Sequence, residues 1–375
     1  MSKPQLRADQ GWIFDNFLML SENEDILHPG IMGTRLARGF MLEDLQAVYT
    51  KVTGRRSFPK AWQKRALSLQ RIAESAEKQG RLVTARQLYH RAALCFGRAQ
   101  HLIPIHGNEQ KESSYRSLYQ CYDKVINLSD GNMIKKSVEF AAGQSAYAVF
   151  HKAPGEGPKP TIIIIPGMDA IKEDVSNPYT SDYLSRGMNV CAIDGPGQGE
   201  GEYIFPIEPE YEKPVQAVID FVDKRKDINL EKIGLWGVSL GGYYAPRAAS
   251  FIERLKACVS LSGPFNFGEC FDHLPTLTSE TFIYRSGSKT ADEAKNNAKL
   301  MTLENCIINL KCPLYIVSGS LDKVIPPEQS DKIEKKAINS REIIHQKISD
   351  GGHVANNRAY KYRMKTADWM LKKLS

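Results

Sequence analysis

Beyond residue 132 the chain alternates short apolar segments with longer amphipathic ones, and this alternation limits its fold more than any other feature. Segment 161–165 reads Thr-Ile-Ile-Ile-Ile, which leaves no polar face to meet water. A strand that is apolar on both faces is typical of a parallel sheet covered by helices on both sides. The sequence therefore predicts an α/β fold with a mostly parallel central sheet.

We expect the series to begin with a hairpin of residues 134–141 and 144–151. Further strands are expected at 161–165, 189–194, 232–236, 256–261, 313–318 and 342–348. Helices are expected at 172–186, 208–225, 241–252, 327–337 and 354–373. Segment 264–310 has neither period and predicts irregular structure.

The start of the chain has a different periodicity. Over residues 42–128 apolar side chains recur every three to four positions, which predicts four helices. Turn signals separate these helices at Gly54, Gly80 and Gly107. We therefore expect an all-helical domain at 1–130 and an α/β domain at 131–375. The second and third helices look like one tetratricopeptide unit, but no repeat follows, so a solenoid is not expected.

The strongest chemical signal is the motif Gly237-Val238-Ser239-Leu240-Gly241, which lies between a predicted strand and a predicted helix. A serine on such a tight turn projects its Oγ above the sheet edge, and the flanking glycines leave room for the turn. The start of the following helix favours negative charge that develops nearby. We predict that Ser239 is a catalytic nucleophile.

A serine hydroxyl needs a base, and the base needs an acid that orients it. Asp322 and His353 each lie in a loop that follows a predicted strand. The chain order Ser, Asp, His then places all three residues at the carboxyl edge of one parallel sheet, which predicts a catalytic triad. Asp350 is the rival acid, but it lies three residues from His353 in the same loop, and we expect it to be a turn residue.

An attacked carbonyl oxygen gains negative charge, which backbone N–H groups must stabilise. We expect one donor at Leu240, directly after the nucleophile, and a second in the loop after strand 161–165. Met168 is the preferred second donor and Gly167 the neighbouring alternative, while an ordinary turn is the competing interpretation. Candidate pocket residues are Gly167, Asp169, Asp194 and Glu269.

Segment 194–200 reads Asp-Gly-Pro-Gly-Gln-Gly-Glu and follows a predicted strand. It lacks both the Gly-Lys-Ser/Thr ending of a phosphate loop and a Gly-x-Gly-x-x-Gly that opens a helix, so we interpret it as a structural turn. Glu269 and Asp272 lie in the irregular segment, where a functional role and simple solvation are equally compatible with the sequence. No His, Cys, Asp or Glu grouping has metal-ligand spacing, and we expect no metal and no cofactor.

Composition narrows the expected partners. The net charge is +7, but the basic residues are scattered along amphipathic helices, so we expect a solvated surface rather than a nucleic-acid site. No segment has the length of a membrane span, and the first residues lack the apolar core of a signal peptide. The seven cysteines lack metal-ligand pairing, which predicts reduced thiols in a cytoplasmic protein. Helices 60–126 offer a candidate homodimer surface, although their own core needs the same apolar faces.

Residues 132–375 resemble the α/β-hydrolase fold. The helical segment ahead of them, together with three motifs, resembles a narrower group that contains dihydroxypseudooxynicotine hydrolase, the FrsA-like esterases, and the polyketide-shortening hydrolases of fungal heptaketide and bacterial anthraquinone pathways. The motifs are Pro166-Gly167-Met168-Asp169, Asp194-Gly195-Pro196-Gly197-Gln198-Gly199-Glu200 and Gly237-Val238-Ser239-Leu240-Gly241-Gly242.

The resemblance implies that residues 1–130 form a lid over the active site. It also implies a small-molecule substrate, such as a free or carrier-bound polyketide, whose β-dicarbonyl C–C bond is cleaved. An acidic residue beyond the nucleophile assists in one member of the group, and Glu269 is the nearest position here. Serine performs the same chemistry on an ester, so a carboxylesterase, a thioesterase, or an enzyme of acyl transfer or cyclisation are alternatives. A catalytically silent fold that binds a partner is the non-enzymatic alternative, and the complete triad argues against it.

Overall fold

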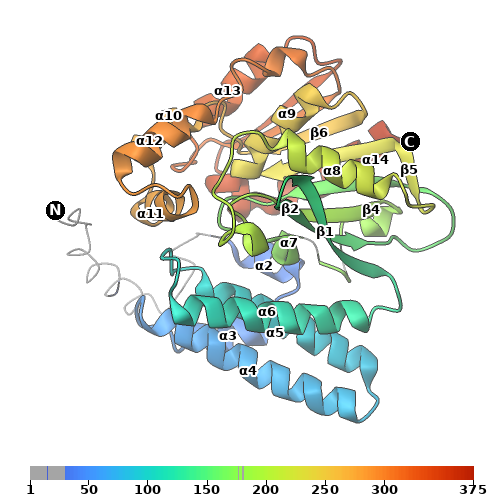
Figure 1. Ribbon diagram of the computed structural model, residues 1–375, viewed down its shortest axis with the longest axis vertical. Coiled ribbons are helices and arrows are strands. Elements are labelled where there is room, and N and C mark those ends of the chain that lie inside the picture. The colour runs from blue at the N-terminus through green and yellow to red at the C-terminus, as the bar shows by residue number, and fades with distance from the viewer. Residues whose placement is uncertain (1–14, 16–29, 176, 180) are drawn as a thin grey trace. The chain divides into compact units, whose positions relative to one another are not determined.

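The computed structural model describes residues 15, 30–175, 177–179 and 181–375. The chain divides into two compact units, Met1–Gly131 and Asn132–Ser375, and each is considered by itself (Figure 1). The predicted helical domain begins at residue 1, but residues 1–14 and 16–29 lie outside the described residues. No helix in the described ranges has the length and apolarity needed to cross a bilayer.

Within residues 30–131, the first unit contains the four predicted helices and one that the periodicity did not predict, α2. Their bounds are α2 Met32–Arg38, α3 Leu42–Tyr49, α4 Ser57–Lys78, α5 Leu82–Gln100 and α6 Glu109–Asn127. The helices α4, α5 and α6 lie side by side (Figure 1). Their shared faces bury the apolar residues that carry the period, including Trp62, Leu69, Tyr89, Phe96, Leu118 and Tyr122. The helical character of this segment thus follows from its amphipathic pattern.

The second unit is built on one eight-stranded sheet with the order β1-β2-β4-β3-β5-β6-β7-β8. The strands are β1 Met133–Ala141, β2 Gln144–His151, β3 Lys159–Ile165, β4 Asn189–Asp194, β5 Ile228–Val238, β6 Leu255–Leu261, β7 Leu314–Gly319 and β8 Ile343–Ile348. The β1–β2 hairpin is antiparallel, as is the pairing of β2 with β4, and the other pairs are parallel. The predicted α/β fold with a mostly parallel sheet is confirmed.

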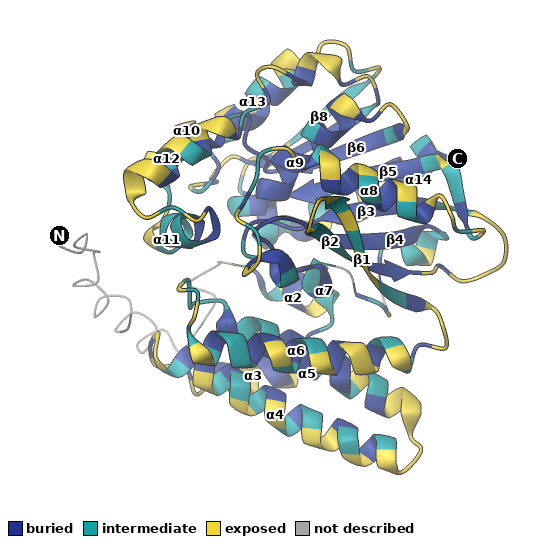
Figure 2. Cartoon of the chain, in the orientation of Figure 1, coloured by how far each residue is buried: buried dark blue, intermediate teal, exposed yellow. Residues whose placement is uncertain are grey.

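The central strand β3 shows why its sequence is apolar throughout. Ile163 and Ile165 belong to one buried cluster, whereas Ile162 and Ile164 belong to a second cluster on the opposite face of the sheet. Helices α8 Glu212–Val222, α9 Leu240–Phe251 and α13 Pro327–Lys336 contribute to the first cluster, and α14 Arg363–Leu374 to the second. Figure 2 shows the inner strands as mostly buried.

The helix expected at 172–186 is wrong, and the helix expected at 354–373 is correct only from residue 363 onward, where α14 begins. The helix expected at 172–186 is replaced by a single turn, α7 Lys172–Val175, and a 3-10 turn, η3 Leu184–Arg186; residues 176 and 180 lie outside the described residues. Pro178 disfavours helical geometry at the residue before it and breaks the pattern. The helix expected at 354–373 begins instead as the kinked 3-10 segment η7 His353–Lys361, where Val354 and Ala355 have positive φ angles of 50° and 45°.

The irregular structure expected at 264–310 is also wrong. This segment forms α10 Phe267–Cys270, η5 Phe271–His273, α11 Thr276–Arg285, α12 Ala291–Leu300 and η6 Ile307–Asn309. These helices have ten residues or fewer, which is too short for a clear period in the sequence. They are held by aromatic packing instead: the Phe267 and Phe282 rings lie 5.0 Å apart in edge-on contact.

Candidate active site

Ser239 lies in the tight turn that joins β5 to α9, with φ 55° and ψ −122°. The backbone comes so close to itself there that a side chain at the flanking positions would overlap it. A Cβ on Gly237 would lie 1.9 Å from the Gly241 carbonyl oxygen, and one on Gly241 would lie 2.3 Å from the Ile165 oxygen. The glycines are therefore required by this close approach, and they hold Ser239 at the carboxyl edge of the sheet.

The structure brings Ser239, His353 and Asp322 together at that edge. Ser239 Oγ lies 3.0 Å from His353 Nε2. His353 Nδ1 lies 2.9 Å from Asp322 Oδ2 and 3.0 Å from Oδ1. Ser239 follows β5, Asp322 follows β7 and His353 follows β8. One continuous chain of hydrogen bonds links the three side chains. In this arrangement His353 can accept the serine proton while Asp322 orients its ring.

Asp322 is held in its ionised form. Its side chain is only 1% exposed, and Oδ1 also accepts hydrogen bonds from the backbone N–H groups of Val324 and Ile325, both at 2.9 Å. Burial by itself would raise the pKa of Asp322, but the charge and hydrogen bond of His353 and these two amides lower it below its usual value. The carboxylate can therefore stabilise a positive charge on the imidazole.

Asp350, the rival acid, has other partners. Its carboxylate accepts hydrogen bonds from Arg358 at 2.6 Å and Lys361 at 3.0 Å. These two hydrogen bonds lower the pKa of Asp350 to about 2. The Asp350 carbonyl also accepts a hydrogen bond from the Asn357 side chain. Asp350 thus ties together the loop that carries His353, and Asp322 is the acid in contact with the histidine.

Of the residues predicted as oxyanion donors, Leu240 follows Ser239 directly and Gly167 lies against it. Leu240 is the first residue of α9, where an amide has no carbonyl partner within the helix. Gly167 faces the serine directly, since a Cβ on Gly167 would lie 3.1 Å from Ser239 Cβ and 3.7 Å from Oγ. Met168 follows it and is buried. The oxyanion role of Leu240 and Met168 remains a prediction.

The other candidate pocket residues differ in their placement. Asp169 is partly exposed next to Met168. Asp194 is fully buried and contacts Lys172 with both oxygens, so its carboxylate does not line an open pocket, contrary to the prediction. Glu269 is 43% exposed and accepts hydrogen bonds from Lys332 at 2.5 Å and Gln329 at 2.7 Å. Asp272 forms an ion pair with Lys295 at 2.6 Å.

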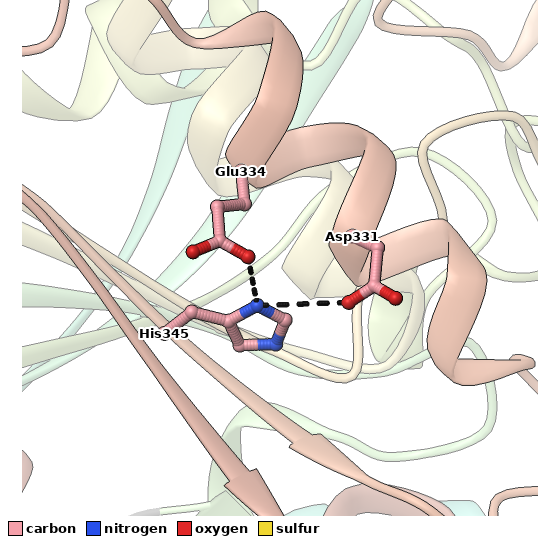
Figure 3. Close-up of side chains that lie close together, drawn as sticks. All are labelled: Asp331, Glu334 and His345. Atoms are coloured by element: carbon pink, nitrogen blue, oxygen red, sulfur yellow. Dashed lines mark hydrogen bonds and ion pairs between the residues drawn. The ribbon is translucent and has the colours of Figure 1, made fainter.

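Within the described ranges, one group of side chains has metal-ligand spacing. His345 Nδ1 lies 2.7 Å from Glu334 and 3.8 Å from Asp331 (Figure 3). These groups are already paired within the protein. Lys347 Nζ lies 2.8 Å from Asp331, and His345 Nε2 lies 2.8 Å from the hydroxyl of Ser318. The cluster joins α13 to β8.

Sequence reasoning missed Gln198 and Arg285, two buried side chains that hold the loop beside Ser239. Gln198 Nε2 donates to the carbonyls of Pro166 and Gly167, and Arg285 donates to the carbonyl of Met168. Gln198 lies in the glycine-rich segment that we interpreted as a plain turn. Arg285 lies in the segment that we expected to be irregular, and its position there gave no signal.

Comparison with known proteins places these features in a family context. A family model described as "Esterase FrsA-like" matches residues 43–375. The 2,6-dihydropseudooxynicotine hydrolase of Paenarthrobacter nicotinovorans is 30% identical over 330 residues, which cover 86% of this chain and 88% of that protein. The crystal structure of 2,6-dihydroxy-pseudo-oxynicotine hydrolase has a TM-score of 0.80 at 28% identity, over 91% of this chain and 95% of that chain.

A fungal relative matches a smaller part. The 20-hydroxy-prefusarin hydrolase FUS2 of Gibberella moniliformis is 29% identical over 226 residues, which cover 57% of this chain and 53% of that protein. The chain therefore spans about half the length of this relative.

Proposed function

The chain belongs to the FrsA-like esterase family, and from this premise we propose that it is a serine hydrolase that forms an acyl-enzyme on Ser239. The observation that supports this most directly is the hydrogen-bonded chain from Ser239 Oγ through His353 to Asp322. A serine with a neighbouring base oriented by a buried carboxylate is the arrangement that nucleophilic acyl transfer needs.

The mechanism follows from this arrangement. His353 Nε2 takes the proton of Ser239 as Oγ attacks the substrate carbonyl, and the imidazolium is stabilised by Asp322. The amides of Leu240 and Met168 bind the oxyanion. His353 then gives its proton to the leaving group, the acyl-enzyme forms, and a water activated by the same histidine releases the acid.

We propose a β-dicarbonyl or polyketide-type substrate that is cleaved at a C–C bond. A carbanion can leave the tetrahedral adduct only when a neighbouring carbonyl or aromatic ring delocalises its charge, which a 1,3-dicarbonyl provides. The relatives named as hydrolases of 2,6-dihydropseudooxynicotine and of 20-hydroxy-prefusarin support this choice. A simple ester is the second candidate, because the family carries the name of an esterase.

Two substrates separate these candidates. An aryl β-diketone reports C–C cleavage, and a short activated ester reports ester hydrolysis. We expect kcat/KM to be higher for the β-diketone, and a reversed preference would favour the esterase. The product mass distinguishes hydrolysis, which adds one water, from acyl transfer to an internal nucleophile or cyclisation, which does not.

We further propose that the helical unit covers the active site and shapes its substrate cavity, that the protein acts in the cytoplasm, and that it binds neither nucleic acid nor membrane. The scattered basic charge of the first 130 residues supports the absence of a nucleic-acid site. A homodimer through this unit is a further proposal, which sedimentation of the full chain tests.

Replacing the nucleophile tests the proposed function. We expect Ser239→Ala to abolish turnover and labelling by a fluorophosphonate, with an unchanged circular dichroism spectrum. Ser250→Ala is the matched control, since Ser250 lies on the same helix and its hydroxyl donates to the Pro246 carbonyl at 2.8 Å. Full activity of Ser239→Ala would refute the assignment.

A further inference from the structure

We propose that the glycine-rich turn of residues 194–202, together with Arg285, is a clamp that orients the loop of residues 166–168 and thereby aims the oxyanion-binding amide at the substrate. These side chains do not touch the substrate, so they are positioning residues. The proposal rests on the proposed function, because it concerns the same active site. All residues of the proposed clamp and of the loop lie in the second unit, Asn132–Ser375.

Gln198 makes the central contacts of the clamp. Its side chain is fully buried, and Nε2 donates to the Pro166 carbonyl at 2.9 Å and to the Gly167 carbonyl at 3.1 Å. Its Oε1 accepts from the Gly195 amide at 3.2 Å and from the Tyr211 hydroxyl at 2.5 Å. Because all of these bonds are buried, the amide cannot rotate without leaving donors and acceptors unpaired.

The contact with Gly167 has a consequence for the next amide. In a trans peptide plane the C=O of one residue and the N–H of the next point in opposite directions. Since the Gly167 carbonyl points at Gln198, the Met168 N–H points away from it. Gly167 lies against Ser239, which places the Met168 amide on the side where the oxyanion forms.

Arg285 holds the next carbonyl. It donates through Nη1 to the carbonyls of Met168 and Gly197, and through Nη2 it forms an ion pair with Glu202 at 2.8 Å. The side chains of Arg285 and Glu202 are 2% and 0% exposed. A guanidinium can serve these three acceptors at once because its donors diverge in one plane, whereas an ammonium would lose that geometry.

The segment that follows the loop ends at Lys172, which is held by ion pairs with two carboxylates. Asp194 accepts a hydrogen bond from the Lys172 backbone amide at 2.8 Å and contacts Lys172 Nζ at 3.1 Å. Glu200 lies 2.6 Å from the same ammonium. The chain that runs from Pro166 to Lys172 is therefore held near its start by Gln198, at Met168 by Arg285, and at its end by these two carboxylates.

The spacing of the turn fits this role. Its polar residues reach the loop, Lys172 or Arg285, and glycines lie between them; these residues are Asp194, Gln198, Glu200 and Glu202. A Cβ on Gly199 would lie 1.8 Å from Asp194 Oδ2, and one on Gly197 would lie 2.3 Å from the Ile207 side chain. The glycines let the turn fold tightly enough for several polar side chains to converge on one short loop.

A pair of matched variants tests the clamp in the full-length protein. Gln198→Met keeps the approximate volume of the side chain but removes the donor. Asn189→Leu is the control: Asn189 is also a fully buried amide, it bonds the Ala153 amide and the Asp227 carbonyl, and it begins the strand that Gln198 follows. Turnover of a short activated ester, melting temperature, and inhibition by an arylboronic acid are measured for both.

We expect both variants to melt at a lower temperature, but only Gln198→Met to lose catalysis. Its kcat should fall by about tenfold or more, toward the ~10²–10³-fold loss typical of removing one oxyanion donor, while KM changes little. The boronic acid forms a tetrahedral adduct on the serine, so its Ki should rise by a similar factor. Unchanged kcat and Ki in folded Gln198→Met, or equal losses in Asn189→Leu, would overturn the clamp.

Arg285→Lys is a second variant that tests the clamp independently. It can decide the question even if Gln198→Met does not fold. Lysine keeps the charge beside Glu202 but loses the divergent donors, so kcat and boronate affinity should fall together. Arg225→Lys is its control, because Arg225 pairs with Asp227 at the opposite end of the sheet. Wild-type kcat in Arg285→Lys would contradict the proposal. Failure of the proposed function itself would look different, since Ser239→Ala would then remain active.

Discussion

The aspartate that contacts His353 is not the one nearest to it along the chain: Asp350 is three positions away, whereas Asp322 is 31 positions away. Asp322 is buried and faces the imidazole, whereas Asp350 is bound by Arg358 and Lys361. An acid that orients a histidine must be fixed against Nδ1, and Asp322 meets this requirement. Asp350 instead stabilises the loop in which Val354 and Ala355 have left-handed backbone angles.

These contacts predict that replacing aspartate by asparagine lowers kcat far more at Asp322 than at Asp350. We expect Asp322→Asn to lower kcat by about 10⁴-fold, because the amide no longer stabilises the imidazolium or selects its tautomer. Asp350→Asn should keep kcat within about tenfold of wild type, since it removes a charge from the loop but not from the histidine. Steady-state kinetics on one ester substrate measure both. A larger loss in Asp350→Asn than in Asp322→Asn would reverse our assignment of the acid.

Glu173 carries a buried charge that the fold does not fully neutralise. Its side chain is 2% exposed, and it shares the Lys172 ammonium with Asp194 and Glu200. Burial raises the pKa of Glu173 to about 7, against the opposing effect of Lys172. One buried lysine therefore faces three carboxylates, and protonation of Glu173 relieves the excess of negative charge.

This raised pKa predicts how stability depends on pH. A carboxyl with a higher pKa in the folded state stabilises the fold below its unfolded pKa, and this contribution is lost as pH rises through about 7. We expect the stability of Glu173→Gln relative to wild type to increase from pH 4.5 to pH 7 and then level off. Urea denaturation across this range measures it, with Glu156→Gln in an exposed loop as the control. A difference that stays constant with pH would refute the prediction.

The turn between β5 and α9 depends on glycine for steric reasons. A Cβ at Gly237 would overlap the backbone of Gly241, and backbone cannot move aside as a flexible side chain can. At Gly33, in α2, the space around a Cβ is open within 4 Å. Replacing glycine by alanine should therefore disrupt the turn at Gly237 but be tolerated at Gly33.

We expect Gly237→Ala to lower the melting temperature sharply and to abolish fluorophosphonate labelling of Ser239. Gly33→Ala should be neutral or stabilising by up to about 1 kcal/mol, because alanine is the better helix former. Thermal unfolding and labelling of both purified variants measure this. A Gly237→Ala protein with wild-type labelling would show that the turn tolerates a side chain.

The whole chain combines a helical unit and a hydrolase unit, and the proposed lid role of the helical unit makes a measurable prediction. We expect an arylboronic acid bound to Ser239 to slow hydrogen exchange of amides in residues 30–131 as well as around the active site. Mass spectrometry of exchanged peptides measures this, with Ser239→Ala and the same compound as the control. Protection confined to the second unit would contradict the lid.

Much of this architecture could be predicted from local patterns. The apolar strand 161–165, the period of the first helices and the glycines around Ser239 each reflect a requirement of the residue's own element, so they can be read from neighbouring positions. The helices within 264–310 could not be predicted, because they are short and depend on packing such as that of Phe267 on Phe282.

Other features depended on contacts between distant parts of the chain. Arg285 meets the Met168 carbonyl across 117 positions, and Gln198 meets the Gly167 carbonyl across 31. No spacing rule connects such residues, because their approach is set by the order of the strands and the depth of the core. The same reason explains Asp194, which we expected in a pocket and which lies fully buried against Lys172. Local sequence was sufficient for the nucleophile and its turn, whereas the surroundings that orient it depend on tertiary packing.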